Sequence, residues 1–152
     1  MRDAKGVDAI ILSGGVGSSS DLDSTDYLEE INIVMRSGKP IFGICLGFEI
    51  ICHVYGFEVE SMPYLEKGVV TIEIREKDLL FKNCSSTMNV FEWHRDKVNK
   101  VSKYLKVLAT SKDGIEAIKH RTKPIYGVQF HPSLLSDNEG YKTLENFLKL
   151  IS

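Results

Sequence analysis

The stretch from Pro40 to Cys52 constrains the fold of this chain more than any other. An apolar run over Pro40–Ile44 predicts a buried strand, and an apolar-periodic helix is expected to begin directly after Cys45. Cys45 stands between Gly43 and Gly47, and small neighbours are needed where a strand turns sharply into a helix. The free N–H groups at the start of that helix favour a thiolate. The pattern predicts a nucleophile elbow. A buried cysteine at an ordinary strand–helix junction is the alternative.

A glycine-rich loop follows another short apolar run. The run Asp8–Leu12 predicts a strand, and the segment Ser13–Ser20 contains three glycines. Glycines let backbone N–H groups approach a ligand closely, so this loop could hold an anion or an oxyanion. Neither the P-loop spacing nor the dinucleotide-binding spacing is present. A loop without a ligand is the alternative interpretation.

The remaining periodicity predicts a two-part α/β domain. Helical spacing of apolar residues predicts helices from Asp23 or Ser24 to Arg36, from Cys45 to Gly56, and from Tyr141 to Ile151. Alternating or apolar runs predict strands at Val69–Ile74, Met88–Trp93, Leu105–Thr110, Ile115–Lys119 and Pro124–Phe130. Alternating strands and helices in the first part predict a parallel sheet with both faces covered, whereas the later strands predict antiparallel pairing. We expect one domain over residues 1–152.

Composition excludes several functional classes. The 152 residues are 43% hydrophobic and 26% charged, with a net charge of -2, which is typical of a soluble globular protein and argues against a nucleic-acid-binding surface. No apolar run approaches the ~20 residues that a membrane span requires. Three cysteines without framework spacing indicate a reducing compartment, and we expect a cytoplasmic protein. His53 and His120 have no partner spacing that suggests a metal site, and no metal or cofactor is expected.

Three of the predicted strands end in groups that can do chemistry. Reactive groups gather at the carboxyl ends of parallel strands, and here these ends carry the Ser13–Gly15 loop, Cys45 and His131. A cysteine and a histidine from separate strand ends can form a nucleophile–base pair. The imidazole would deprotonate the thiol and later protonate the leaving amine. The glycine loop and the Leu46 amide would then hold a tetrahedral oxyanion.

Four motifs in order carry a family resemblance. They are Ser13-Gly14-Gly15, Gly43-Ile44-Cys45-Leu46-Gly47, Trp93-His94-Arg95-Asp96-Lys97-Val98 and Gly127-Val128-Gln129-Phe130-His131-Pro132. Together they span most of the chain, which resembles the class I glutamine amidotransferases and is most similar to the glutaminase part of GMP synthase. The resemblance implies a flavodoxin-like, mostly parallel sheet with flanking helices and an antiparallel portion.

The resemblance also implies an activity and a site. Glutamine would be hydrolysed through a γ-glutamyl thioester on Cys45 with His131 as the base, and the ammonia would pass to an ATP-using synthetase on another chain. Backbone groups of Gly15 and Leu46 would form the oxyanion hole. The implied substrate pocket comprises Gly14, Glu49, Trp93, His94, Arg95 and Asp96.

Two departures from the family pattern concern the catalytic residues. The triad carboxylate is replaced by Ser133, which can bond an imidazole but cannot stabilise imidazolium by charge; Asp137 and Glu139 could substitute for it. Glu49 stands where the family has a substrate-holding glutamine. Its charge should raise the pKa of the Cys45 thiol, or it could bind the α-ammonium group of a substrate, or it could point to solvent.

Other departures concern the pocket wall and the start of the fold. Arg95 replaces a glycine common beside the motif histidine. The strand–helix–strand unit that opens the family fold is expected to be absent, so that Asp8–Leu12 becomes an open sheet edge through which the chain could self-associate. We further expect Trp93 and Cys52 to be core residues and His94 to have a structural role in the pocket wall.

Three functional interpretations stay open from the sequence. The first is a glutaminase that supplies a synthetase. The second is a catalytically degenerate relative that serves as a binding or regulatory module, in which Cys45 persists because it packs. The third is a hydrolase of another γ-glutamyl compound, which would account for the altered pocket at Glu49 and Arg95.

Overall fold

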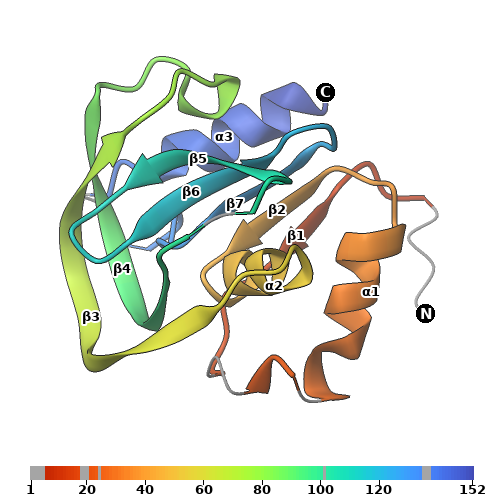
Figure 1. Cartoon of the computed structure of the whole chain (residues 1–152). Helices are drawn as coiled ribbons and strands as arrows, with labels where there is room; N and C mark the ends of the chain where they lie inside the picture. The colour runs from red at the N-terminus through yellow and green to blue at the C-terminus, as the bar shows by residue number, and fades with distance from the viewer. Residues whose placement is uncertain (1–5, 18–20, 24, 101, 135–137) are drawn as a thin grey trace.

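The protein is described here by a computed structural model, which covers residues 6–17, 21–23, 25–100, 102–134 and 138–152. Within these residues, one mixed sheet runs in the order β1-β2-β7-β6-β5-β3-β4 (Figure 1). Its strands are β1 (Ile10–Leu12), β2 (Ile41–Ile44), β3 (Val59–Ile74), β4 (Thr87–Val98), β5 (Leu105–Thr110), β6 (Ile115–His120) and β7 (Ile125–Val128). The helices are α1 (Leu28–Arg36), α2 (Leu46–Val54) and α3 (Tyr141–Leu150), with 3-10 turns at Thr25–Tyr27 and Leu79–Phe81.

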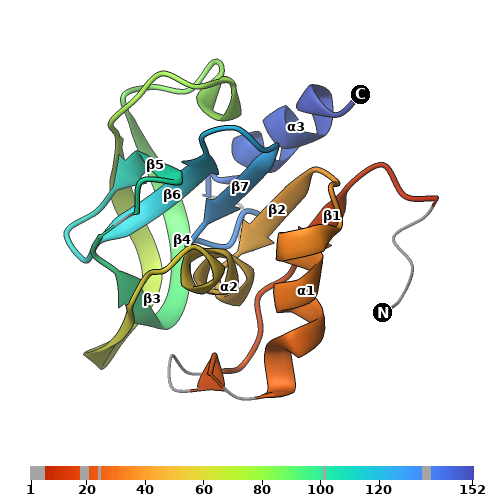
Figure 2. The same ribbon diagram turned by 45° about the vertical axis from the view of Figure 1, so that its right-hand side comes forward.

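The sheet has the predicted division into a parallel and an antiparallel part. Strand β2 pairs in parallel with β1 and with β7, whereas β6 pairs antiparallel with β7 and with β5. Helices α1 and α2 lie on one face of the sheet and α3 lies on the other (Figure 2). The predicted α/β class is confirmed, and the parallel strands bring the ends of β1, β2 and β7 to one edge.

Two apolar clusters occupy the two faces of the sheet. One contains Phe48 and Ile51 of α2 together with Ile41 of β2, and the other packs Phe147 of α3 against Phe42 of β2. Neighbouring residues of β2 belong to different clusters because side chains alternate between the faces of a strand. A strand that is buried on both sides reads as a continuous apolar run, which is why β2 was evident from the sequence.

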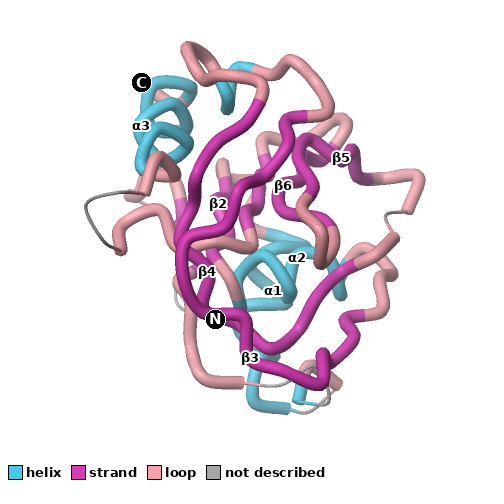
Figure 3. The backbone as a smooth tube through the Cα atoms, turned by 90° about the vertical axis from the view of Figure 1, so that its left-hand side faces the viewer, coloured by secondary structure: helices cyan, strands magenta, loops and turns pink. Residues whose placement is uncertain are grey.

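Strand β3 begins ten residues earlier than the sequence pattern predicts. It pairs with β4 over most of its length, with an irregularity between Ser61 and Glu66, whereas only Glu73 and Ile74 pair with β5. The first part of β3 therefore has one partner strand, and most of its side chains are exposed or half-buried. A polar, proline-containing segment is compatible with such an edge position but gives no alternating apolar signal. Figure 3 shows β3 as a long curved strand at the side of the molecule.

Several other expectations need adjustment. The predicted helix up to Arg36 is a 3-10 turn followed by α1, which begins at Leu28. Trp93 is 48% exposed, so its predicted core position is wrong; the Lys67 ammonium group lies 4.2 Å from the centre of its ring. Cys52 is fully buried, as expected.

Strand β1 occupies one edge of the sheet, as the sequence led us to expect. Among the described strands its one partner is β2, with Ile11 aligned with Phe42, and Ile11 is 47% exposed. Across the described ranges, no helix has the length and apolarity needed to cross a membrane.

Substituting Gly47 by alanine should destabilise the fold strongly. A Cβ at this position would lie 2.2 Å from the Leu12 carbonyl oxygen, and backbone cannot move aside as a flexible side chain does. We expect a loss of about 3 kcal/mol in the free energy of unfolding, measured by urea denaturation with circular dichroism. Gly56→Ala is the control: its φ is +86° but nothing lies within 4 Å, so strain alone should reduce stability by about 1 kcal/mol. Equal losses in the two variants would show that crowding is not the cause.

Candidate functional site

The turn between β2 and α2 holds Cys45 in a strained backbone conformation. Its φ is 51° and its ψ is -107°, a region that non-glycine residues adopt only when the surrounding structure imposes it. The surroundings are tight, because a Cβ at Gly43 would lie 2.6 Å from the Gly47 carbonyl oxygen. The Cys45 N–H donates to the Val128 carbonyl at 2.9 Å, which ties the turn to β7. The predicted elbow geometry is thus present.

Cys45 and His131 converge on one carbonyl oxygen. The Trp93 carbonyl lies 3.8 Å from Cys45 Sγ and 3.3 Å from His131 Nε2. Gly14 lies against both side chains, because a Cβ there would be 2.9 Å from His131 Cε1 and 3.5 Å from Cys45 Cβ. Strand ends far apart in sequence therefore bring the thiol, the imidazole and the glycine loop together.

The imidazole of His131 is oriented by backbone rather than by a carboxylate. Its Nε2 faces the Trp93 carbonyl, and its own backbone N–H donates to the Phe91 carbonyl at 2.8 Å. Ser133 is exposed, and within the described residues no hydrogen bond joins it to His131. Burial lowers the pKa of His131, which keeps the imidazole neutral.

Of the two proposed substitutes for the triad acid, only Glu139 is described by the structure, and its hydrogen bonds go elsewhere. Glu139 accepts hydrogen bonds from the Asn89 N–H and the Lys142 ammonium group, so its carboxylate is already engaged by partners other than His131. Asp137 lies outside the described residues. Among the described residues, the carbonyl of Trp93 is the group that hydrogen-bonds with the His131 ring.

Glu49 is buried beside the sulfur. It is 3% exposed, so the solvent-pointing alternative is wrong, and its Oε1 accepts a hydrogen bond of 2.9 Å from Gln129 Nε2. The same Gln129 nitrogen lies 3.9 Å from Cys45 Sγ. Burial raises the pKa of Glu49, and the Gln129 hydrogen bond opposes that rise. Nothing in the sequence singled out Gln129 within its motif.

The thiol of Cys45 is held in its protonated form by its surroundings. Burial first, and then the charge of Glu49, raise its pKa to about 12, while the Leu46 N–H works in the opposite direction. The expected effect of Glu49 on the thiol is thus present. Burial outweighs the favourable helix N-terminus, because desolvation disfavours the charged form.

The groups expected to hold an oxyanion are also brought together. A Cβ at Gly15 would lie 3.1 Å from Leu46 Cδ2, so the glycine loop rests against the first turn of α2. A hollow of about 230 Å³ opens beside this contact and is lined in part by Ser13, Gly14 and Leu46. The glycine loop and the start of α2 therefore border a common space, one residue along the chain from Cys45.

Strand β4, whose Trp93 carbonyl contacts Cys45 and His131, has one buried face and one exposed face. His94 and Asp96 are buried, whereas Arg95 is exposed on the other face of the strand. The buried Glu92 on this strand and Glu116 on β6 were not predicted from the sequence. Burial raises the pKa of Glu92 to about 7 and raises that of Glu116 well above its usual value. The sequence alone does not show whether a charged residue in a strand is exposed or buried.

Comparison with known proteins decides the family. The family model described as "Glutamine amidotransferase class-I" matches residues 1–151. The chain belongs to the class I glutamine amidotransferase family. Among its relatives, the glutamine-hydrolyzing GMP synthase subunit of Methanothermobacter thermautotrophicus is 36% identical over 96% of this chain and 74% of that protein. The protein of the same name from Methanocaldococcus jannaschii is 39% identical over 96% of this chain and 75% of that protein.

Solved structures of the family share this architecture. A protein of Thermoplasma acidophilum, provisionally described as a GMP synthase subunit, superimposes with a TM-score of 0.83 at 26% identity, covering 97% of this chain and 74% of that one. A glutamine amidotransferase of Thermotoga maritima shares the fold with a TM-score of 0.77 at 20% identity, covering 98% of this chain and 64% of that one. The motif resemblance found in the sequence is confirmed at the level of the family.

Proposed function

We propose that residues 1–152 act as the glutaminase of a GMP synthase-like pair, hydrolysing glutamine and supplying ammonia to an ATP-using synthetase on another chain. The observation that carries this proposal is the convergence of Cys45 Sγ and His131 Nε2 on the Trp93 carbonyl, at a strained strand–helix turn. The relatives named as glutamine-hydrolyzing subunits of GMP synthase support the substrate and the separate synthetase.

The chemistry follows from the positions of these groups. His131 takes the thiol proton, and the sulfur of Cys45 attacks the side-chain amide carbon of glutamine. The N–H groups of Gly15 and Leu46 stabilise the oxyanion of the tetrahedral intermediate. As the C–N bond breaks, His131 returns the proton and ammonia leaves. Water then attacks the thioester, the C–S bond breaks, and glutamate and the thiol are released.

The free chain should hydrolyse glutamine slowly. A thiol whose pKa is about 12 carries little thiolate at neutral pH, and a glutaminase that acts without its synthetase wastes substrate. Docking of the synthetase is the step that would lower this pKa, by moving Glu49 away from the sulfur. Comparison of glutamate release with and without the synthetase measures this activation.

Covalent labelling tests the proposal directly. The pure protein is incubated with a diazoketone analogue of glutamine, and peptide mass mapping follows each cysteine. We expect the label on Cys45 alone, although Cys84 is the more exposed thiol. Cys52 and Cys84 serve as internal controls. An intact fold with no label on Cys45, even at pH 9 and with the synthetase present, would overturn the proposed function.

Replacing Ser133 by glutamate should increase glutamate release at least tenfold. A carboxylate two residues after His131 restores the charge that stabilises imidazolium, and removing that acid from serine-protease triads lowers kcat by about 10⁴. The assay is initial-rate glutamate release, and Ser133→Gln is the matched control because it adds length without charge. If Ser133→Gln raises the rate as much as Ser133→Glu does, or if neither variant raises it, the missing triad carboxylate does not limit turnover.

A degenerate binding module is the second candidate, and one observation favours it. Cys45 is 5% exposed with its pKa raised to about 12, which also describes an inert, packed cysteine. Such a module would bind the synthetase without releasing glutamate. The labelling experiment separates the two candidates, because the packed cysteine stays unlabelled in the complex.

A further inference from the structure

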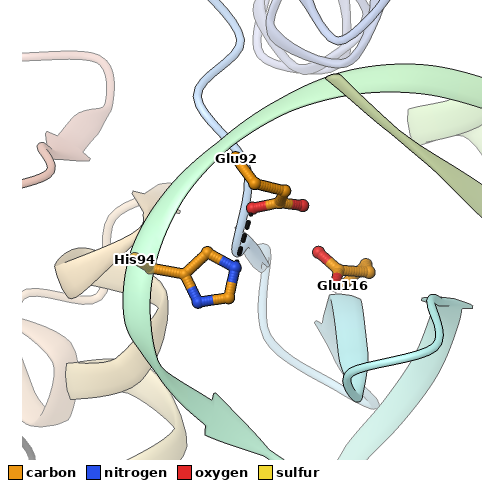
Figure 4. A group of neighbouring side chains, drawn as sticks. All are labelled: Glu92, His94 and Glu116. Atoms are coloured by element: carbon orange, nitrogen blue, oxygen red, sulfur yellow. Dashed lines mark ion pairs between the residues drawn. The ribbon is translucent and has the colours of Figure 1, made fainter. Parts of the chain in front are cut away.

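Three buried side chains meet between β4 and β6. Glu92 and His94 share one face of β4, and Glu116 reaches them from β6 (Figure 4). One potential ligand atom from each lies within 4.8 Å of the others. The side chains of Glu92 and His94 are 1% and 3% exposed, and Glu116 is 2% exposed. Bulk water therefore does not solvate these groups.

The outer contacts of this cluster leave lone pairs facing inward. His94 Nδ1–H donates to the Asp96 carbonyl at 2.6 Å, which leaves the Nε2 lone pair directed at the cluster. The Ser111 hydroxyl donates to Glu116 Oε1 at 2.6 Å, which leaves the Glu92 side of Glu116 directed into the cluster. This is the arrangement of groups that orient metal ligands from behind.

The inward-facing atoms face only one another. Both oxygens of Glu92, Oε2 of Glu116 and Nε2 of His94 form no hydrogen bond with a described residue outside the cluster; within it, Glu92 pairs with His94 and faces Glu116. Glu92 Oε2 lies 3.0 Å from His94 Nε2, and two lone pairs at this distance repel unless a proton or a cation lies between them. No lysine or arginine in the described ranges forms an ion pair with any of the three. A cation would compensate the two buried carboxylates.

We propose that Glu92, His94 and Glu116 bind one divalent transition-metal cation, with Zn²⁺ as the best-fitting ion. One imidazole and two carboxylates suit Zn²⁺, whereas Mg²⁺ and Ca²⁺ prefer oxygen ligands alone. Tetrahedral ligands at ~2.0–2.2 Å from the ion stand roughly 3.4 Å apart, so small side-chain rotations close the site. A water molecule completes the coordination.

The position of this cation gives it a role in the cleft. Glu92 and His94 flank Trp93, whose carbonyl contacts Cys45 and His131. A bound ion would fix the strand on both sides of that carbonyl. The site itself does not depend on the proposed glutaminase activity, because among the described residues its ligands form no hydrogen bond with the sulfur or with the imidazole of His131.

The test is Zn²⁺ binding by chelator-treated protein. We expect one Zn²⁺ per chain by elemental analysis, a calorimetric Kd of about 1 µM or below, and a rise in Tm of roughly 5 °C at a hundredfold excess over Kd. Glu92→Gln and Glu116→Gln, which keep the side-chain shape, should each weaken binding at least tenfold. His53→Gln and Cys45→Ser are controls for other ligands and should bind as wild type does.

A measurement on the wild-type chain covers the case of variants that do not fold. Co²⁺ bound at this site should show visible d–d bands without the near-ultraviolet charge-transfer band of a cobalt–thiolate bond. Absence of binding at about 100 µM Zn²⁺, loss of binding in Cys45→Ser, or a thiolate band would each overturn the proposal. The two glutamates would then share a proton in place of a metal. Loss of glutaminase activity would not affect any of these readouts.

Discussion

Cys45→Ala should reduce glutamate release by about a thousandfold or more at pH 9, where the wild-type thiol is more ionised than at neutral pH. No other described thiol can replace the sulfur, because Cys52 is fully buried and Cys84 lies in the loop after the Leu79–Phe81 turn. The fold should be retained, since alanine keeps the Cβ that packs against Gly14. Initial-rate glutamate release, with glutamine at saturation and circular dichroism to verify folding, gives the measurement.

The control for this variant is Cys84→Ala, which removes a half-buried thiol outside the cleft. Its rate should equal that of the wild type. A second control, His131→Asn, should lower the rate less than Cys45→Ala at high pH, because hydroxide can then deprotonate the thiol without a base. Retained glutamate release in Cys45→Ala would show that the thioester route is not the source of the product.

Glu49→Gln should make Cys45 roughly 30-fold more reactive at pH 7. The carboxylate and the sulfur share Gln129 Nε2 as a neighbour, at 2.9 and 3.9 Å, so they are close enough for strong repulsion of a thiolate. Two like charges at roughly 7 Å repel by about 2 kcal/mol at an effective dielectric constant of 20, which corresponds to that factor. In Glu49→Gln, the carbonyl oxygen of the new side chain can still accept the hydrogen bond from Gln129 Nε2, so the packing is preserved.

The pH dependence of alkylation measures this effect. In the wild type, with the thiol pKa near 12, the rate of iodoacetamide labelling of Cys45 should rise about tenfold per pH unit from pH 7 to 10 without a plateau. In Glu49→Gln the same curve should move to lower pH by about 1 to 2 units. Glu145→Gln, an exposed position on α3, is the control and should leave the curve unchanged. An unshifted curve in Glu49→Gln would mean that burial alone sets the pKa.

Some elements of this fold can be predicted from the sequence and others cannot. Strand β2 and helix α2 were evident because a strand buried on both faces reads as an unbroken apolar run, and the glycines beside Cys45 leave room for a tight turn. The first part of β3 was not evident from the sequence, because a strand with one partner and mostly exposed side chains needs no apolar pattern. Outside the irregularity between Ser61 and Glu66, its residues pair through backbone groups, which requires no apolar side chain.

The candidate site divides in the same way. Cys45, His131 and the glycine loop could be placed together because strand polarity alone brings their ends to one edge. Contacts between side chains could not be predicted from the sequence. Glu49 faces Gln129 rather than solvent, and Trp93 lies outside the core. Glu92 and Glu116 were missed because their proximity depends on how β4 curves over β6, and charge in a sequence does not reveal burial.

The alternation of β4 has a consequence for how this protein can be altered. The backbone of Trp93 borders the cleft, while the side chains before and after it enter the interior. Inserting or deleting one residue there would exchange interior and exterior side chains and move the carbonyl at the same time. Changes in length are therefore tolerable in the irregular stretch between Ser61 and Glu66 of the neighbouring strand, but not within the few residues around Trp93.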